Sequence, residues 1–287
     1  MTLRRSASER LAMALLKRPY RDPHGDKGWY GLLAQPQRHR VVRQDIEVAG
    51  WPKFARPLRI AFLTDFHTGS HTGDVGRFTA IMDEAAAFKP DLVLFGGDYM
   101  NMHLVGGGRV PPHTVAAMLA RLDGPLGRVA VLGNHDYIYG EDDVAAAFRA
   151  RSITVLDHER RTLTFEGHAL DIVGVPDAHL LRDEARELLA GLRGDRPGIV
   201  LAHDPMWFAH VPVGPFLTLS GHTHGGQIRL PGIGILHNAS TAPMHWSHGL
   251  TVENGRTLYV SAGLGTSLIP LRIGVPPEFA ILDVNGA

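Results

Sequence analysis

The sequence predicts an α/β fold, in which buried strands alternate with helices along the chain. Two observations predict it. Short, nearly continuous apolar runs have the pattern of parallel strands covered on both faces, and segments with helical spacing of apolar residues separate them. Several of these runs also end directly at polar residues next to glycine. Because ligands in such folds bind beyond the carboxyl ends of the strands, we expect the functional site there.

Composition excludes several kinds of site. The 287 residues include no cysteine, so disulfides, thiolate metal sites and cysteine nucleophiles are excluded. Lys and Arg together number 29, as do Asp and Glu, and this net charge of zero gives no strong nucleic-acid signal. Histidine, with 17 residues, is the side chain in excess. No segment approaches the ~20 consecutive apolar residues that a membrane-spanning helix needs.

Residues 1–40 are predicted to be a basic appendage to one domain at 41–287, because turn formers precede residue 40 and no linker follows it. Within residues 1–21, six Lys and Arg side chains surround the apolar run Leu11–Leu16. That run is shorter than the usual core of a signal peptide, and no clear small-residue cleavage site follows it. Two interpretations stay open: a frayed basic helix or tail, and a helix that lies on an anionic membrane surface.

The first elements form a strand-helix-strand unit after an edge strand. Val41–Val48 partly alternates between apolar and polar residues, as an edge strand does. Leu58–Thr64 and Asp91–Phe95 are apolar runs of the buried kind. Between them, Val75–Phe88 has apolar residues on one side of a helix, which ends before Pro90.

The same alternation continues through the rest of the chain. Helical spacing predicts three more helices, at Pro112–Leu122, Glu141–Ala150 and Asp183–Leu192. Apolar runs bounded by turn residues predict the remaining strands, which are Arg128–Leu132, Ile153–Leu156, Arg161–Phe165, Leu170–Val173, Gly198–Ala202, Phe216–Ser220, Arg256–Ser261 and Phe279–Val284. The long stretch Gly232–Gly255 is irregular, and we expect it to enclose a substrate.

Polar side chains that suit a metal ion follow five of the predicted strands. They are Asp65 and His67, Asp98, Asn134 and His135, His203, and His222 and His224. Taken singly, an aspartate after a strand is more often a helix cap, and a Gly-Asn pair is more often a turn. Taken together, carboxylate, imidazole and amide groups without sulfur are the ligands of a dinuclear site that suits Mn, Fe or Zn.

These motifs resemble those of the calcineurin-like metallophosphoesterases. In the order of that family, the chain has Asp65-Phe-His67, Gly97-Asp98, Gly133-Asn-His-Asp136, His203 and Gly221-His-Thr-His224. The extension Gly225-Gly226-Gln227 is similar to that of a bacterial branch often found tethered to membranes. The resemblance implies the metallo-dependent phosphatase fold, a four-layer α/β/β/α sandwich of two mixed β-sheets flanked by helices.

The resemblance also implies two divalent metal ions, with manganese expected and iron, zinc or magnesium as alternatives. The implied ligands are Asp65, His67 and His224 for one ion and Asn134, His203 and His222 for the other, with Asp98 bridging the two. The implied reaction is hydrolysis of a phosphodiester or pyrophosphate, in which a metal-bridging hydroxide attacks phosphorus in line.

His135 and Asp136 are the implied catalytic residues. His135 would stabilise the transition state or protonate the leaving oxygen, and Asp136 would orient it. For Asp136, a helix-capping role is an equal alternative. His71, His103 and Arg272 lie on predicted loops, where such side chains are more often solvated than in contact with a substrate.

The expected substrate is a small-molecule or lipid-linked phosphoester or pyrophosphate. Similarity to the membrane-tethered branch and the basic segment at 1–21 favour a lipid-linked one, with the protein cytoplasmic and peripheral at the inner membrane. The alternatives are a general phosphodiesterase for nucleotides or nucleic acid and a non-catalytic binding scaffold on the same fold. The missing basic excess argues against long nucleic acids, and the complete ligand set argues against the scaffold.

Overall fold

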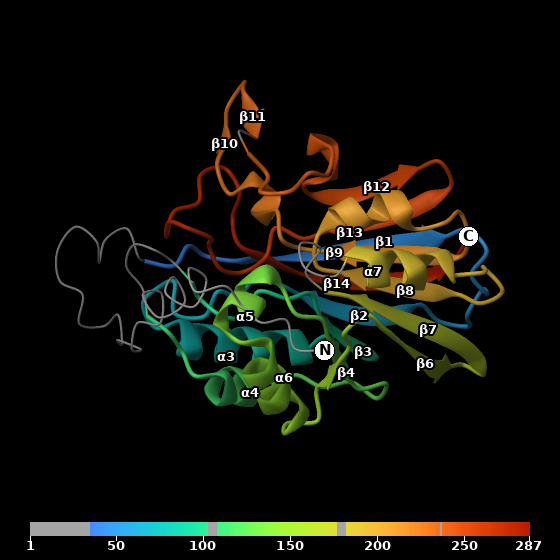
Figure 1. The fold of residues 1–287 in the computed structure, drawn as a ribbon, viewed down its shortest axis with the longest axis horizontal. Coiled ribbons are helices and arrows are strands. Elements are labelled where there is room, and N and C mark those ends of the chain that lie inside the picture. Colours follow the sequence, from blue (N-terminus) through green and yellow to red (C-terminus); the bar gives the residue numbers. More distant parts are fainter. Residues whose placement is uncertain (1–34, 103–107, 177–181, 236) are drawn as a thin grey trace.

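A computed structural model describes residues 35–102, 108–176, 182–235 and 237–287 of the chain (Figure 1). The expected membrane contact at 1–21 therefore lies outside the described residues, as do most of the appendage at 1–40 and His103. In the part of the chain that is described, no helix is both long enough and apolar enough to cross a bilayer.

The first sheet has six strands in the order β1-β14-β2-β3-β4-β5. Their bounds are Arg40–Val48 for β1, Glu278–Gly286 for β14, Leu58–Leu63 for β2, Leu92–Phe95 for β3, Arg128–Ala130 for β4 and Thr154–Val155 for β5. Neighbouring strands are parallel except β14 and β2, which are antiparallel. The last strand of the chain thus inserts between the first two, and β1 lies at the edge that its alternating sequence predicts.

The second sheet also has six strands, in the order β12-β13-β9-β8-β7-β6. Their bounds are Gly249–Glu253 for β12, Arg256–Val260 for β13, Phe216–Ser220 for β9, Gly198–Ala202 for β8, His168–Val175 for β7 and Glu159–Phe165 for β6. The inner pairs are parallel and the two outer pairs are antiparallel hairpins. A separate antiparallel hairpin consists of β10 (Arg229–Leu230) and β11 (Gly234–Ile235).

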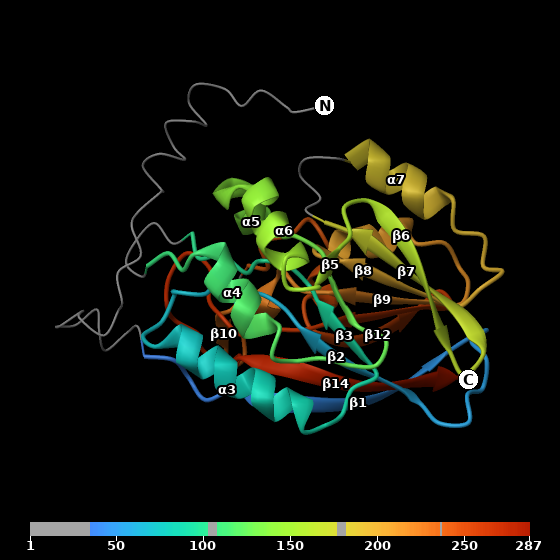
Figure 2. The same cartoon turned by 90° about the horizontal axis from the view of Figure 1, so that it is seen from below.

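Helices cover the outer face of each sheet (Figure 2). The described helices are α3 (Asp74–Ala86), α4 (Pro112–Leu119), α5 (Asn134–Tyr139), α6 (Glu141–Arg149) and α7 (Arg182–Ala190). Buried side chains of α3, α4 and α6 pack on the first sheet, and those of α7 pack on the second. Apolar side chains of both sheets, such as Ile60 and Leu219, meet in one core between them. The predicted four-layer α/β/β/α sandwich is therefore confirmed.

The structure corrects the interpretation of Gly232–Gly255 as irregular. This stretch contains β11, a short 3-10 helix at Met244–Trp246, and β12, which pairs with β13 along its whole length. The residues of β12 are only half-buried or exposed, as at a sheet edge, so the strand lacks the continuous apolar run that identifies buried strands. Helical spacing of apolar residues does not predict α5, because its first residues belong to the Gly-Asn-His-Asp motif.

Hydrogen bonds between strand ends bring the candidate residues of the two sheets together. Beyond β2 and β3, the N–H of Asp65 donates to the carbonyl of Gly97 at 2.9 Å. Beyond β8 and β9, the N–H of Gly221 donates to the carbonyl of His203 at 3.0 Å. The N–H of His222 then reaches across to the carboxylate of Asp65 at 3.0 Å, so the two sheets share one site.

Candidate metal centre

One group of candidate ligands joins the ends of β2 and β9. Asp65, His67 and His224 are all buried, and one ligand atom of each lies within 4.8 Å of the others. The Nε2 atoms of His67 and His224 are 3.0 Å apart, and Nε2 of His224 lies 3.7 Å from Asp65 Oδ1. Two nitrogens and a carboxylate at this separation can bind one divalent cation.

A second group joins the ends of β3, β8 and β9. Asp98, His203 and His222 again place their ligand atoms within 4.8 Å of one another. Nδ1 of His222 lies 3.2 Å from Nε2 of His203, which in turn lies 3.3 Å from Oδ1 of Asn134. The amide oxygen of Asn134 is therefore placed to complete this group.

Asp98 lies between the two groups. Its Oδ2 is 3.5 Å from Nε2 of His67, and its Oδ1 is 3.6 Å from Nε2 of His203. Each carboxylate oxygen thus faces one group, which is the geometry of a bridging ligand.

Hydrogen bonds on the outer side of two histidines select the nitrogen that faces the centre. Nδ1 of His203 donates to the carbonyl of Gly96 at 2.7 Å, so the lone pair of the neutral ring is on Nε2. Nε2 of His222 donates to the carbonyl of Ala239 at 2.9 Å, which leaves Nδ1. The donor atoms in the second group are therefore oriented before any ligand binds.

Five candidate ligands have backbone torsions that non-glycine residues rarely adopt. They are Asp65, His67, Asp98, His222 and His224, with φ between 42° and 66°. Strain of this kind persists only where the surrounding structure enforces it, and it concentrates at functional sites. The glycines beside them are needed for space, since a Cβ on Gly221 would collide with the carboxylate of Asp65.

Burial and mutual charge shift the ionisation of the cluster. Burial raises the pKa of Asp65 to about 7, with the neighbouring His203 opposing the rise. Burial lowers the pKa of His203, but the Asp98 carboxylate outweighs it and raises the pKa to about 10. Burial and the nearby His67 hold the pKa of His224 well below its usual range. A buried cluster of carboxylates and imidazoles suits a divalent cation, which removes the need to share protons.

His135 lies at the side of the centre. Its ring meets that of His67 edge-on at 4.5 Å between centroids, and its backbone N–H donates to Asp98 Oδ1 at 2.9 Å. Its Nε2 lies 4.0 Å from Asp98 Oδ2 and 3.5 Å from Oγ of Ser267. His135 also forms a third compact group with His67 and Asp98, so the arrangement allows metal ligation as well as acid catalysis.

Asp136 accepts hydrogen bonds from the backbone at the ends of two strands. Its Oδ2 accepts the N–H groups of Asp98 and Gly133, and its Oδ1 accepts those of Tyr99 and Met100, all at 2.9 to 3.0 Å. The carboxylate therefore fixes the backbone that carries Asp98. It is also the third residue of α5, which agrees with the helix-capping alternative.

Two buried side chains at the site were missed or misjudged from the sequence. Arg272 is buried rather than solvated, and its guanidinium lies 3.1 Å from Nδ1 of His224. Asp204 is buried directly after His203, and its Oδ2 lies 3.6 Å from Nε2 of His222. Its position beside a candidate ligand was the only signal for Asp204. No local pattern marks Arg272, because its partners at Ala262, Gly263 and Gly265 are backbone carbonyls, which residues of every type carry.

Comparison with known proteins agrees with this geometry. The family model described as calcineurin-like phosphoesterase matches residues 58–226, which span Asp65 to His224. The chain belongs to this family. It is accordingly a metal-dependent phosphoesterase, and the resemblance seen in its motifs is confirmed.

Bacterial proteins of similar length are among its relatives. The uncharacterized protein YpbG of Bacillus subtilis (strain 168) is 31% identical over 235 residues, covering 80% of this chain and 82% of the relative. The phosphodiesterase YaeI of Escherichia coli (strain K12) is 29% identical over 269 residues, covering 90% of each chain. Among solved structures, Haemophilus influenzae NAD nucleotidase (NadN) matches 74% of this chain with a TM-score of 0.48 and 16% identity. This chain spans 45% of the length of that protein.

Proposed function

We propose that this phosphoesterase hydrolyses a phosphodiester or pyrophosphate with two divalent metal ions, and that its substrate is lipid-linked. The observation that carries the proposal is the position of Asp98, whose two carboxylate oxygens face different groups of ligands. A single-ion site would not need a carboxylate placed between two sets of imidazoles. The relative YaeI is a phosphodiesterase, which supports a diester as the class of substrate.

The two groups of ligands divide between the ions. Asp65, His67 and His224 would hold one, Asn134, His203 and His222 would hold the other, and Asp98 would contact both. When bound, such ions neutralise phosphate oxygens and lower the pKa of a water molecule that attacks phosphorus. Two divalent cations against Asp65 and Asp98 leave a local charge of about +2, which attracts a phosphoester to a protein of zero net charge. Oxygen and imidazole nitrogen donors suit Mn, Fe or Zn, and manganese is the metal that we propose.

His135 is placed to act on the leaving oxygen. It extends from α5, and its ring lies next to His67 of the first group and to Asp98, which lies between the two groups. Its Nε2 can hold a proton next to a phosphoester that is bound between the ligand groups. Asp136 supports this indirectly, because it fixes the backbone of Asp98 and the start of the helix that carries His135.

The domain organisation and location are part of the proposal. Residues 41–287 would form the catalytic domain, and residues 1–40 a basic appendage that holds the protein at the cytoplasmic face of the inner membrane. The six basic side chains around the apolar run Leu11–Leu16 support this, because such segments bind anionic lipid surfaces.

A panel of substrates tests the function. Metal-free full-length protein is given Mn²⁺, Mg²⁺, Zn²⁺ or no metal, and assayed with a phosphomonoester, a phosphodiester, a cyclic nucleotide and a lipid-linked pyrophosphate. We expect Mn²⁺-dependent hydrolysis of the diester and the lipid-linked pyrophosphate. Preference for the cyclic nucleotide would identify a nucleotide phosphodiesterase instead. Protein that binds two ions but hydrolyses nothing would be the binding scaffold.

A further inference from the structure

An exposed apolar surface lies beside the candidate metal centre. It consists of Ile233, at the tip of the β10–β11 hairpin, and Leu268, Ile269 and Ile273, in the segment before β14. These side chains are 69%, 61%, 43% and 39% exposed, respectively, and we call them the apolar rim. Large apolar side chains grouped on a surface usually mark a binding site.

Backbone pairing joins the two segments that carry the rim. Ile228, just before β10, forms a parallel bridge with Ile273, and the N–H of Arg229 donates to the carbonyl of Ile273 at 2.8 Å. The side chain of Gln227 ties the same two segments together, since its Nε2 donates to the carbonyls of Ser267 at 3.0 Å and Ile269 at 3.2 Å. Figure 1 shows the hairpin projecting from the body next to this segment.

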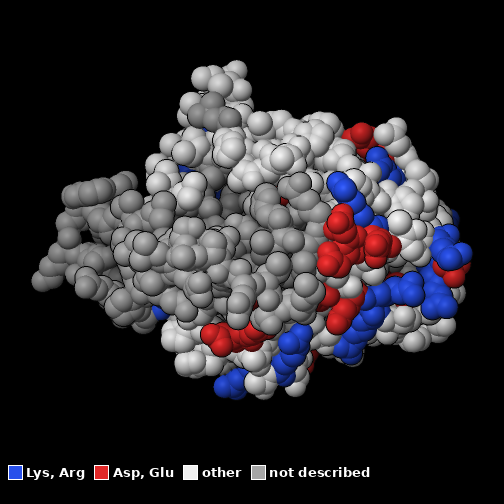
Figure 3. All heavy atoms as spheres, viewed as in Figure 1, with Lys and Arg blue, Asp and Glu red and all other residues white. Residues whose placement is uncertain are grey.

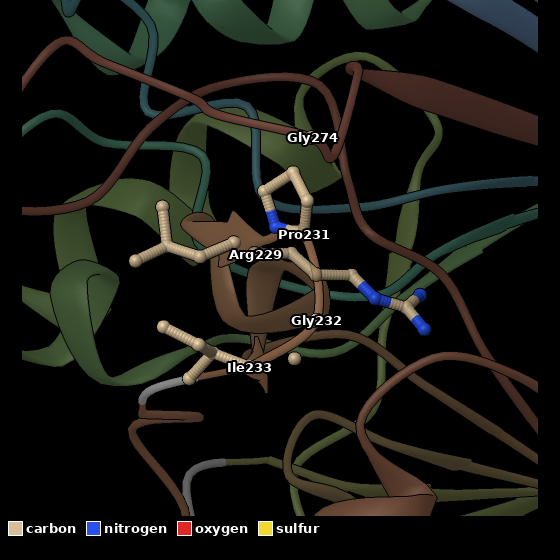
Figure 4. Close-up of a pocket in the computed structure, with 7 residues that line it drawn as sticks. Arg229, Pro231, Gly232, Ile233 and Gly274 are labelled. Atoms are coloured by element: carbon tan, nitrogen blue, oxygen red, sulfur yellow. The ribbon is translucent and has the colours of Figure 1, made fainter.

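The rim adjoins the catalytic machinery. Gln227 comes three residues after His224, and Ser267 places its Oγ 3.5 Å from Nε2 of His135. A surface that binds the rim would therefore lie next to the centre. A hollow of about 520 Å³ on the hairpin is lined by Arg229, Pro231, Ile233 and Gly274 among others, so polar and apolar groups share that part of the surface (Figure 4).

This part of the chain lacks charge to an unusual degree. No Lys, Arg, Asp or Glu occurs in residues 230–252 or in residues 257–271. On the face shown in Figure 3, the described surface over the hairpin is mostly uncharged, whereas charged side chains lie at the right and along the lower edge. Exposed hairpins in water normally carry several charged side chains, which limit aggregation, but residues 229–235 carry only Arg229, at the start of β10.

Residues 35–37, which follow the basic segment in the sequence, lie next to the rim and indicate what binds there. Gln37 donates from Nε2 to the carbonyl of Arg272 at 2.7 Å, and residues 35–37 line a hollow with Pro270 and Leu271. The six Lys and Arg residues of positions 1–21 thus precede a chain that meets the body next to the rim. Uncharged apolar surface beside a basic segment suits an anionic bilayer, whose interface accepts apolar side chains and whose phosphates attract Lys and Arg.

We propose that the apolar rim is a lipid-binding surface that seats this protein on an anionic bilayer. Ile233 and Leu268 enter the interface, and the basic segment contacts the lipid phosphates. The bilayer then lies beside His135, so phosphoesters in the lipid headgroup layer reach the centre. This last step rests on the proposed function, whereas lipid binding itself does not.

Vesicle flotation of the full-length protein in EDTA tests the proposal without catalysis. The vesicles are phosphatidylcholine alone or with phosphatidylglycerol. The test variant is Ile233→Ser with Leu268→Ser. The matched control is Val213→Ser with Val252→Ser, because those valines are 71% and 67% exposed, Val252 lies on β12, and Val213 lies next to Gly255 in the turn that follows it. We expect binding that requires phosphatidylglycerol, a loss of about tenfold or more in the rim variant, and no change in the control.

Three outcomes would overturn the proposal. They are no flotation of the unmodified protein, an equal loss in both double variants, and a rim variant that floats normally. Sedimentation velocity is run in parallel, because a dimer that dissociates only in the rim variant would make the rim an interface between copies of this chain. Hydrolysis of a soluble phosphodiester by the same proteins separates the two proposals. Absence of hydrolysis with intact flotation would reject the proposed function and leave lipid binding in place.

Discussion

Arg272 places its Nη2 3.1 Å from Nδ1 of His224 and donates from the same atom to the carbonyls of Ala262 at 2.7 Å and Gly265 at 2.6 Å. The loop that contains these carbonyls packs against the first ligand strand, because the N–H of Gly265 donates to the carbonyl of Asp65 at 2.6 Å. One buried guanidinium therefore holds two ligands of the same group in register.

Arg272→Lys is expected to weaken binding of the first metal ion by about 10- to 100-fold, because an ammonium keeps the charge but cannot reach all these carbonyls. Equilibrium dialysis with Mn²⁺ measures the affinity of each site. Arg256→Lys is the control, since Arg256 likewise donates to backbone carbonyls, those of Phe208, Ala209 and Val211, away from the centre. Equal metal affinity in the Arg272 variant and the control would show that Arg272 serves the fold alone.

Asp204→Asn is expected to weaken binding of the second metal ion by about 10- to 100-fold and to leave binding of the first unchanged. Asp204 accepts the hydroxyl of Ser240 at 2.6 Å and so holds the loop whose Ala239 carbonyl orients His222. The visible spectrum of Co²⁺-substituted protein reports the geometry of each site during titration. The control is Asp171→Asn. Asp171 is a buried residue of β7, and its carboxylate accepts a hydrogen bond from the hydroxyl of Thr162 at 2.6 Å. A loss confined to the first ion would contradict the assignment.

His135→Gln is expected to keep both metal ions and to lose about 10²- to 10⁴-fold in kcat with alkyl leaving groups, the range of general acid catalysis. The loss should be much smaller for a p-nitrophenolate leaving group, which needs no proton. Measuring kcat against leaving-group pKa, with metal analysis of the same samples, separates the roles. Loss of one metal ion in the His135 variant would instead identify His135 as a ligand. His168→Gln is the control, because His168 is exposed.

The sequence predicts those features that depend on local pattern. Buried strands such as Gly198–Ala202 and Phe216–Ser220 have the predicted bounds, because a continuous apolar run covered on both faces has few alternatives. The polar ends of five strands likewise predict which residues the fold brings together. Their roles as ligands stay predictions until metal binding is measured.

Features that depend on distant pairing could not be predicted in this way. Nothing in Glu278–Gly286 indicates that it inserts between β1 and β2, because strand order is decided by contacts across more than two hundred residues. Arg272 was misjudged for a different reason, since its partners Gly265 and Ala262 are near in the sequence but are backbone carbonyls, which no residue type marks. For Asp136 the sequence left two roles open, orienting His135 or capping a helix, and the backbone N–H groups from the end of β3 that its oxygens accept were not foreseen.

Glu278→Gln is expected to destabilise the metal-free protein in a manner that depends on pH. Burial opposes ionisation of this carboxylate, but hydrogen bonds from His248, the N–H of Ala262 and Arg40 outweigh it and lower the pKa to about 2. A pKa below the unfolded value stabilises the fold above about pH 4.5, and this contribution disappears as pH falls through the folded pKa. The shift corresponds to about 3 kcal/mol at pH 7 and about 1 kcal/mol at pH 3. Urea unfolding at these pH values measures the difference in free energy of unfolding between the unmodified protein and the variant. Glu47→Gln is the control, because Glu47 is on the exposed side of β1. If this difference in free energy of unfolding stays constant from pH 7 to pH 3, packing, and not the charge of Glu278, accounts for the lost stability.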